Sequence, residues 1–117
     1  SYPEVKLVYL FGSQARGDAG VSSDYDFAFY LESCDRARMN DLKLTLLGEL
    51  SRILETEKVD VVFLNLPIAP ELKYAALKEG ILLFEQEPYR VMIEPRILNE
   101  YFDFHHMLVR NRLTNVE

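Results

Sequence analysis

A glycine-serine pair between two strand-like runs is the feature that most constrains the fold of this chain. Residues 5–11 read VKLVYLF, a short apolar run rich in β-forming residues, and Gly12 and Ser13 follow it directly. A second strand-like run begins with Asp24 and Asp26, separated by one tyrosine. Because alternate residues of a strand share a face, the two carboxylates are expected to point the same way.

Strand-like and helical segments alternate along the rest of the chain. The expected elements are strands over 24–31, 59–65 and 81–85, and helices over 35–57 and 70–80. The first helix is indicated by an apolar stripe of Met39, Leu42, Leu46, Leu50, Ile53 and Leu54. Together these segments predict one domain over 1–117 of the α/β or α+β class. Its mixed sheet would have four or five strands and be covered by helices.

The last helix has two possible starts. A proline disfavours helical backbone at the residue before it, so we expect this helix to begin near Pro95; the alternative is one longer helix from about Pro88, kinked at Pro95. Its apolar face would be Ile97, Leu98, Tyr101, Phe102, Leu108 and Val109. Bulky side chains in this helix lie at every angle, so some are expected to be exposed. We therefore expect residues 95–113, or the rim of the 12–26 turn, to contact a partner.

Composition and charge exclude several classes of protein. Hydrophobic residues make up 49% of the chain and charged residues 27%, and no apolar run approaches the roughly 20 residues that span a bilayer. Cys34 is the only cysteine and no signal-peptide pattern is found, so a reduced, cytoplasmic setting is expected. The net charge of −6 weighs against binding of long nucleic acid and hence against a polymerase.

A third carboxylate, Asp60, interrupts the apolar run of the 59–65 strand, where a charge is costly unless paired or metal-bound. Mg²⁺ prefers one or two carboxylates plus phosphate oxygens, and a glycine-serine turn offers backbone N–H groups to phosphates. Taken singly, Asp24 could cap a turn, and Asp26 and Asp60 could be solvated strand residues. In combination with the turn, the three acids favour nucleotidyl transfer assisted by two metal ions.

The motifs together resemble a known family. The run LFGSQARG over residues 10–17, the run SDYD over 23–26 and the later strand aspartate are similar to the minimal nucleotidyltransferase (MNT) branch of the DNA polymerase β-like superfamily. The resemblance implies the palm-like nucleotidyltransferase fold and Mg²⁺-dependent transfer of AMP from ATP. Members usually carry a helix before the first strand, whereas here the first strand is expected near residue 5, which leaves stability and oligomeric state open.

The resemblance also implies roles for individual residues. Asp24 and Asp26 would bind both metal ions, and Asp60 would bind the catalytic one. The triphosphate would be held by Gly12 and Ser13. Arg16 and Ser23 complete the expected nucleotide site; Arg16 could instead pair with a neighbouring acid and brace the turn.

The expected partner also follows from the resemblance. Residues 100–104 (EYFDF) look like the ending of MNT proteins paired with HEPN-domain toxins. This implies an antitoxin that transfers AMP to a tyrosine hydroxyl of its HEPN toxin, in a homo- or hetero-oligomer, without a membrane. A chain of this size has room for the catalytic sheet and its helices, so its acceptor must be docked by another protein. Two alternatives stay open: a small-molecule nucleotidyltransferase whose substrate half comes from a second subunit, and a non-catalytic nucleotide-binding module that blocks the toxin sterically.

Other chemically suggestive residues have simpler interpretations. His105 and His106 have no third ligand patterned beside them, so solvent exposure or helix packing is expected. For Tyr89, Tyr101 and Phe104, core packing is at least as good an explanation as a partner surface. Cys34 is expected to be an inert thiol.

Overall fold

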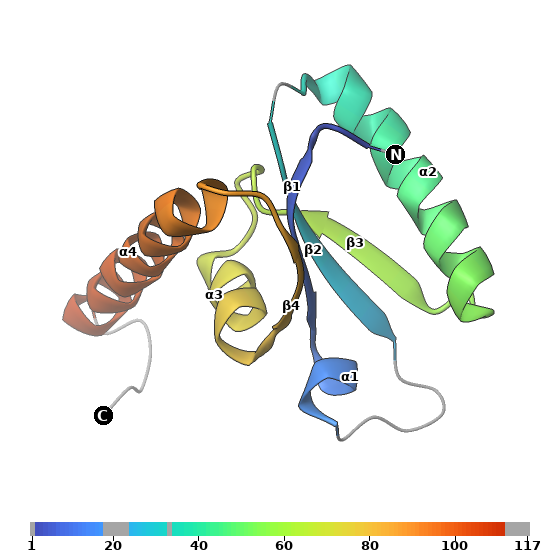
Figure 1. Cartoon of the computed structure of the whole chain (residues 1–117). Helices are drawn as coiled ribbons and strands as arrows, with labels where there is room; N and C mark the ends of the chain where they lie inside the picture. The colour runs from blue at the N-terminus through green and yellow to red at the C-terminus, as the bar shows by residue number, and fades with distance from the viewer. Residues whose placement is uncertain (1, 18–23, 33, 112–117) are drawn as a thin grey trace.

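The computed structural model describes residues 2–17, 24–32 and 34–111. Its elements are β1 (Val5–Phe11), α1 (Ser13–Arg16), β2 (Tyr25–Leu31), α2 (Arg36–Leu54), β3 (Val59–Phe63), α3 (Pro70–Glu79), β4 (Ile81–Glu85) and α4 (Tyr89–Arg110). Figure 1 shows the sheet between α2 on one side and α3 with α4 on the other. The expected class, a mixed sheet covered by helices, is confirmed.

The strands of the described residues form one four-stranded sheet in the order β3-β2-β1-β4. β1 pairs antiparallel with both β2 and β4, whereas β2 and β3 run parallel. The alternative of five strands is not realised by the part of the chain that is described. β2 therefore lies between β1, which ends just before Gly12, and the strand that contains Asp60.

Each face of the sheet carries its own apolar core. On one face, Leu7, Tyr9 and Phe11 of β1 belong to a cluster completed by α3 and α4. On the other face, the larger buried side chains of β2 and β3 pack against Leu42 and Leu46 of α2; they are Phe27, Phe29, Leu31, Val61 and Phe63. The two-residue periodicity of the strands thus divides their side chains between two helical layers.

The helix α2 is shorter than expected. It begins after Asp35, whose carboxylate accepts a hydrogen bond from the Arg38 backbone N–H at 2.8 Å, and ends at Leu54 rather than at residue 57. Glu55 ends it in the left-handed conformation, at φ 56°. Ile53 does not belong to the buried stripe, because 62% of its surface is exposed. At 100° per residue Ile53 lies on the same helix face as Leu42 and Leu46, so its exposure distinguishes the last turn of α2 from the turns that meet the sheet.

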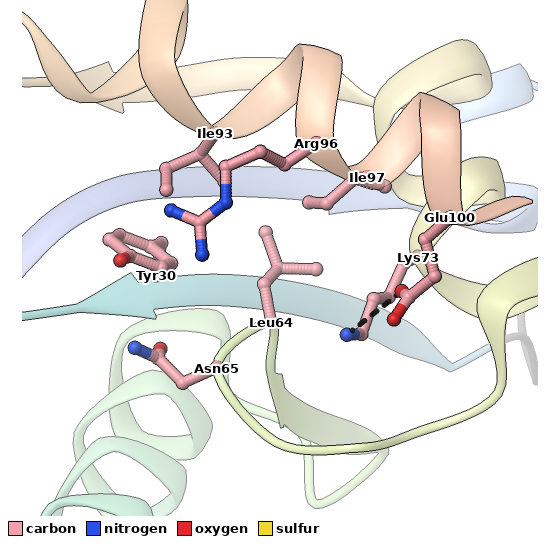
Figure 2. A pocket seen from close by; sticks show the side chains of 8 residues that line it. All are labelled: Tyr30, Leu64, Asn65, Lys73, Ile93, Arg96, Ile97 and Glu100. Carbon is pink, nitrogen blue, oxygen red and sulfur yellow. Dashed lines mark hydrogen bonds and ion pairs between the residues drawn. The ribbon is translucent and has the colours of Figure 1, made fainter.

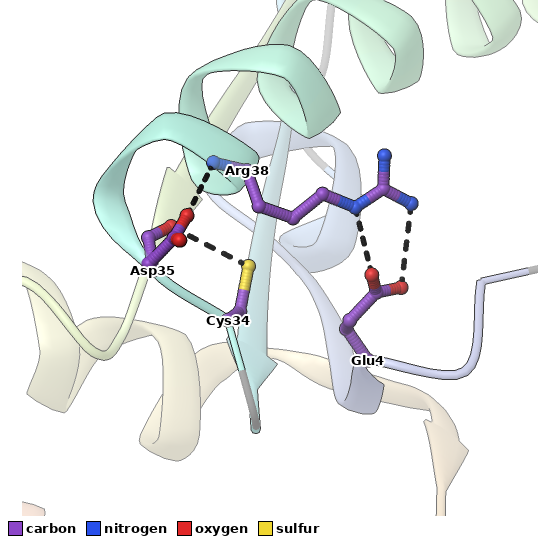
Figure 3. Close-up of polar contacts among 4 residues, drawn as sticks. All are labelled: Glu4, Cys34, Asp35 and Arg38. Atoms are coloured by element: carbon purple, nitrogen blue, oxygen red, sulfur yellow. Dashed lines mark hydrogen bonds and ion pairs between the residues drawn. The ribbon is translucent and has the colours of Figure 1, made fainter.

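The N-terminus of α2 is tied to the start of β1. The Arg38 guanidinium contacts the Glu4 carboxylate with its Nε at 2.7 Å, and Figure 3 shows this ion pair beside the Asp35 cap. The hydrogen bond from Arg38 holds the pKa of Glu4 below its usual range. Cys34 lies beside these residues, and burial raises the pKa of its thiol, which fits the inert role expected for it.

The helix α3 begins at Pro70 and is followed by Gly80, as expected. A Cβ atom at position 80 would lie 2.0 Å from the carbonyl oxygen of Ala76 and 3.1 Å from that of Leu10. Only glycine allows the chain to pass this closely from the helix into β4.

The helix α4 corrects the expectation that the last helix begins near Pro95. It starts at Tyr89, directly after Pro88, and continues through Pro95 to Arg110. The longer-helix alternative is therefore the right one. The backbone bond that Pro95 cannot donate is outweighed by packing on both sides of it, because Ile93 and Ile97 are both buried in the core.

A side-chain clasp holds the same stretch of α4 against the sheet. The buried Tyr9 donates a 2.6 Å hydrogen bond to the Glu94 carboxylate, which also accepts one from Arg90 at 2.9 Å. Burial and this bond raise the pKa of the Tyr9 hydroxyl far above its usual value. Glu94, the residue expected to be extended, is thus fixed in helical backbone by a tertiary contact.

The expected apolar face of the last helix is only partly right. Phe102 is 54% exposed and Val109 41% exposed, so neither lies in the core. Tyr101 stacks on Tyr74 of α3 at 4.0 Å between ring centroids. His105 packs near the Tyr101 ring and His106 is exposed, as their simpler interpretation predicted. Tyr89 packs against the core cluster, the first of the two interpretations left open for it.

The described helices include none that combines the length and apolar character needed to cross a membrane.

Candidate functional site

The register between β2 and β3 brings two of the three predicted carboxylates together. Asp26 pairs with Asp60 in the parallel ladder, so both side chains leave the same face of the sheet from adjacent strands. Neighbouring strands lie about 4.8 Å apart. Asp60 belongs to β3 as expected, although this strand ends at Phe63 rather than at residue 65.

The third carboxylate, Asp24, lies immediately before β2 and is exposed. Its negative charge nevertheless acts on the Asp26 carboxyl. Burial raises the pKa of the Asp26 carboxyl above its usual range, and the negative charges of Asp60 and Asp24 raise it further. Asp26 is therefore the centre of an acidic group contributed by the start of β2 and by β3.

The glycine-serine turn lies directly against this centre. Phe11, the last residue of β1, pairs with Asp26, so Gly12 leaves the sheet beside that carboxylate. Gly12 has φ 80°, and a Cβ atom there would lie 2.5 Å from Asp26 Oδ2. A side chain at position 12 is excluded both by the backbone conformation and by the approach of the carboxylate.

The short helix α1 continues from this turn. Ser13, which is half-buried, opens it, and Gly17 closes it in the left-handed conformation with an N–H bond to the Ser13 carbonyl at 3.1 Å. Arg16 ends α1, and its side chain lies outside the described part of the structure. Ser23 also lies outside the described residues.

The donors at this centre fit Mg²⁺ in chemistry but do not form a closed cage. Within residues 2–17, 24–32 and 34–111, no three His, Cys, Asp or Glu side chains converge closely enough to hold an ion. Mg²⁺ does not require such a cage, since it is usually held by one or two carboxylates together with substrate phosphates. The register pair Asp26 and Asp60, with Asp24 beside it, supplies carboxylates of that kind.

Sequence reasoning missed the polar groups that hold the surrounding fold. The Tyr9–Glu94 clasp joins β1 to α4, and Asn65, just beyond β3, exchanges hydrogen bonds with the Leu31 backbone at 2.8 and 2.6 Å. The expected strand over 59–65 includes Asn65, although an asparagine at the end of an apolar run is a turn signal. No comparable sequence signal marks Tyr9, since a tyrosine in a strand is usually explained by packing alone.

Residues 1–89 match the family model described as polymerase beta, nucleotidyltransferase. The chain belongs to this nucleotidyltransferase family. The matched residues include β1, the turn at Gly12, all three acids and β4, so the family assignment covers the whole candidate site.

A curated relative of this nucleotidyltransferase domain is the protein adenylyltransferase MntA of Aphanizomenon flos-aquae (strain 2012/KM1/D3). The two are 31% identical over 91 residues, which are 72% of this chain and 59% of that protein. The chain therefore spans somewhat more than half the length of the curated relative it matches.

Solved structures share the fold of this nucleotidyltransferase domain. A toxin-antitoxin crystal structure with AMP-PNP superposes with a TM-score of 0.73 at 22% identity, covering 95% of this chain and 83% of that one. A chain from the complex of tri-AMPylated Shewanella oneidensis HEPN toxin with MNT antitoxin gives 0.67 at 21% identity, covering 95% and 80%. At this level of identity the likeness concerns the fold, which extends to nearly all of the described elements.

Proposed function

We propose that this protein is a Mg²⁺-dependent adenylyltransferase that moves AMP from ATP to a tyrosine hydroxyl of a cognate HEPN toxin and thereby acts as its antitoxin. The observation that carries the proposal is the arrangement around Asp26. The parallel register sets Asp60 beside it, and Gly12 approaches it too closely for any other residue. Nucleotidyl transfer requires a turn that can hold phosphate groups and a pair of carboxylates on the same face of the sheet.

In this proposal the glycine-serine turn positions the triphosphate. The backbone N–H groups at Gly12 and Ser13 would hold phosphate oxygens, with Ser23 and Arg16 adding contacts to the same nucleotide. Bound Mg²⁺, held by Asp24, Asp26 and Asp60 as two ions, would neutralise phosphate charge and favour ionisation of the acceptor hydroxyl. The charges of Asp60 and Asp24, which together with burial raise the pKa of Asp26, are the like charges that bound Mg²⁺ would offset.

The transfer step itself needs little covalent help from the protein. The acceptor oxygen would form a bond to the α-phosphorus of ATP while the bond to the bridging oxygen breaks and pyrophosphate leaves. The hydroxyl proton would pass to solvent or to a carboxylate of the site. Asp60, on the outer strand of the pair, would orient the acceptor side of this reaction.

The proposed acceptor rests on the relatives. The curated relative is named a protein adenylyltransferase, and the fold is shared with chains of toxin-antitoxin complexes, one of them holding an AMPylated HEPN toxin. The expectation that the 95–113 segment, or the rim of the 12–26 turn, contacts the toxin or a second copy of this chain remains a prediction. Residues 18–23 and 112–113 of these ranges lie outside the described residues, and within the described part Phe102 is 54% exposed.

Intact-mass spectrometry of a HEPN protein from the same genome, co-expressed with this chain, tests the proposal. We expect the HEPN protein to gain the mass of one or more AMP groups on tyrosine. Asp60→Asn should abolish the gain without loss of ATP binding, because this residue is assigned to the reacting side of the site. Asp41→Asn, on the exposed surface of α2, is the matched control and should leave the modification unchanged.

The other outcomes distinguish the alternatives. An unmodified HEPN protein bound tightly to this chain would favour steric inhibition, and an unmodified protein that does not bind would favour a small-molecule substrate. Full modification by the Asp60→Asn variant would show that the third carboxylate has been assigned wrongly.

A further inference from the structure

A polar cavity lies on the same sheet face as the acids, at the opposite end of β2. Its volume is about 270 Å³, and it is enclosed by the ends of β2 and β3, by α3 and by α4 (Figure 2). Asp26 and Tyr30 are four residues apart on β2, which is roughly 13 Å at 3.3 Å per residue. The cavity is therefore separate from the acidic centre.

Two cations contribute to the lining of this cavity. The side chain of Lys73 is only 9% exposed, and its ammonium group lies 3.2 Å from the Glu100 carboxylate, which is itself 51% exposed. A buried ammonium is costly, and a solvated partner compensates it only in part. The sequence signal for this residue is a lysine between the apolar positions Leu72 and Ala76 of α3.

The second cation is Arg96 of α4. Figure 2 shows its guanidinium reaching from the helix into the cavity, toward Tyr30. Burial and a hydrogen bond to Glu32 raise the pKa of Tyr30 to about 12, while the positive charge of Arg96 acts in the opposite direction. Among the described residues, no carboxylate forms an ion pair with Arg96. Its donors are thus available to a ligand.

The remaining polar groups of the lining are already engaged. Asn65 bonds the Leu31 backbone, and the Tyr30 hydroxyl donates to Glu32 at 2.7 Å. The rest of the wall is apolar, formed by Leu64, Ile93, Ile97 and the ring face of Tyr30. The cavity therefore offers two cations against one carboxylate, beside an apolar surface.

We propose that this cavity binds a phosphate monoester that carries a ring system, the class to which nucleoside monophosphates belong. Arg96 and Lys73 would hold the phosphate, since guanidinium and ammonium donors form the stronger, charge-assisted hydrogen bonds to it. A bare phosphate would leave most of the 270 Å³ unfilled, whereas a ring can pack on the isoleucines and on Tyr30. In a chain of net charge −6, this local excess of positive charge selects an anion.

Calorimetric titration of the full chain with 5′-AMP in EDTA tests the site. Without divalent metal the acids repel phosphate, so metal-free binding reports on the cavity. Adenosine and inorganic phosphate are the two comparison probes, and each should bind at least about tenfold more weakly than AMP, a difference of roughly 1.4 kcal/mol. Arg96→Gln should weaken AMP about tenfold or more, as expected for loss of a charge-assisted bond. Arg110→Gln, the same charge change at the exposed end of α4, should not weaken it.

Location is tested by amide chemical shifts and by a variant at the acids. AMP should shift the resonances of Leu64, Asn65 and residues 93–100, and Asp26→Asn should leave its affinity unchanged. Shifts confined to Gly12 and Ser13, a loss of affinity in Asp26→Asn, or equal affinity in Arg96→Gln and the parent chain would each overturn the proposal. Failure of this test leaves the adenylyltransferase proposal standing, because that proposal concerns the other end of the sheet.

Discussion

Asp26 has an electrostatic cost in the free protein. Its pKa is raised by burial and by the charges of Asp60 and Asp24, so the fold favours its protonated form more than the unfolded chain does. Its contribution to stability is therefore fully present below the unfolded pKa, near 3.8, and is lost as the pH rises through the higher folded value. At neutral pH the ionised group destabilises the metal-free fold.

Asp26→Asn should accordingly raise the melting temperature of the metal-free protein by a few degrees at pH 7, because an amide of the same shape removes the cost of burying a charge and the like-charge repulsion. The gain should shrink toward zero near pH 3, where the carboxyl is protonated in both states. Differential scanning calorimetry at the two pH values measures this. Asp41→Asn should shift neither value appreciably, and a lower melting temperature for Asp26→Asn at pH 7 would contradict the account.

At the scale of single residues, much of the site could be predicted from the sequence. The two-residue spacing of Asp24 and Asp26 and the position of Gly12 after an apolar run were enough to expect one acidic centre beside a turn. What the sequence could not supply was the pairing of Asp26 with Asp60, because parallel register is set by contacts between distant segments. The cavity cation Lys73 could not be expected from the sequence, because the 70–80 helix is predicted from its bounds alone and a lysine is usually exposed.

Among the elements, α2 shows how a local signal fixes an end of a helix. The Asp35 carboxylate satisfies the Arg38 N–H, one of the four donors that a helix N-terminus leaves without an internal partner. Arg38 also reaches Glu4, so the cap holds the residue that ties α2 to β1.

Asp35→Ala should lower the free energy of unfolding by about 1 kcal/mol, the usual cost of losing an N-cap acceptor. Urea denaturation monitored by circular dichroism gives the value. Asp35→Asn is the matched control, since its side-chain oxygen can accept the same bond, and it should cost only a small fraction of that amount. Equal losses in the two variants would mean that charge, and not capping, is what matters there.

In the helix α4, tertiary contacts override the local sequence signal of a proline. Pro95 predicts a boundary, yet the helix passes through it because Ile93 and Ile97 are buried and Tyr9 holds Glu94. None of these contacts is local in sequence. Residue propensity decides an element only where tertiary packing leaves it free.

For the whole molecule, the acids and the turn predict coupled binding of metal and nucleotide. Mg²⁺ with ATP at a hundredfold excess over Kd should add about 2.7 kcal/mol of stability, a rise in melting temperature of roughly 10 °C. ATP alone should do much less, because the acids repel its phosphates. Thermal denaturation in Mg²⁺ alone, in ATP alone and in the two together gives these shifts. An equal shift with ATP alone would place the nucleotide away from the acids.

The parallel alignment of β2 and β3 also makes catalysis a reporter of correct sheet assembly. A slip of β3 by one residue would turn Asp60 into the apolar layer beneath α2 and bring a valine, Val59 or Val61, beside Asp26. The content of helix and strand would hardly change, so a circular dichroism spectrum would not distinguish such a molecule from the correctly folded one. The same slip would bury the Asp60 carboxylate without a partner, which is energetically costly. The residue that the site needs therefore also disfavours the wrong alignment.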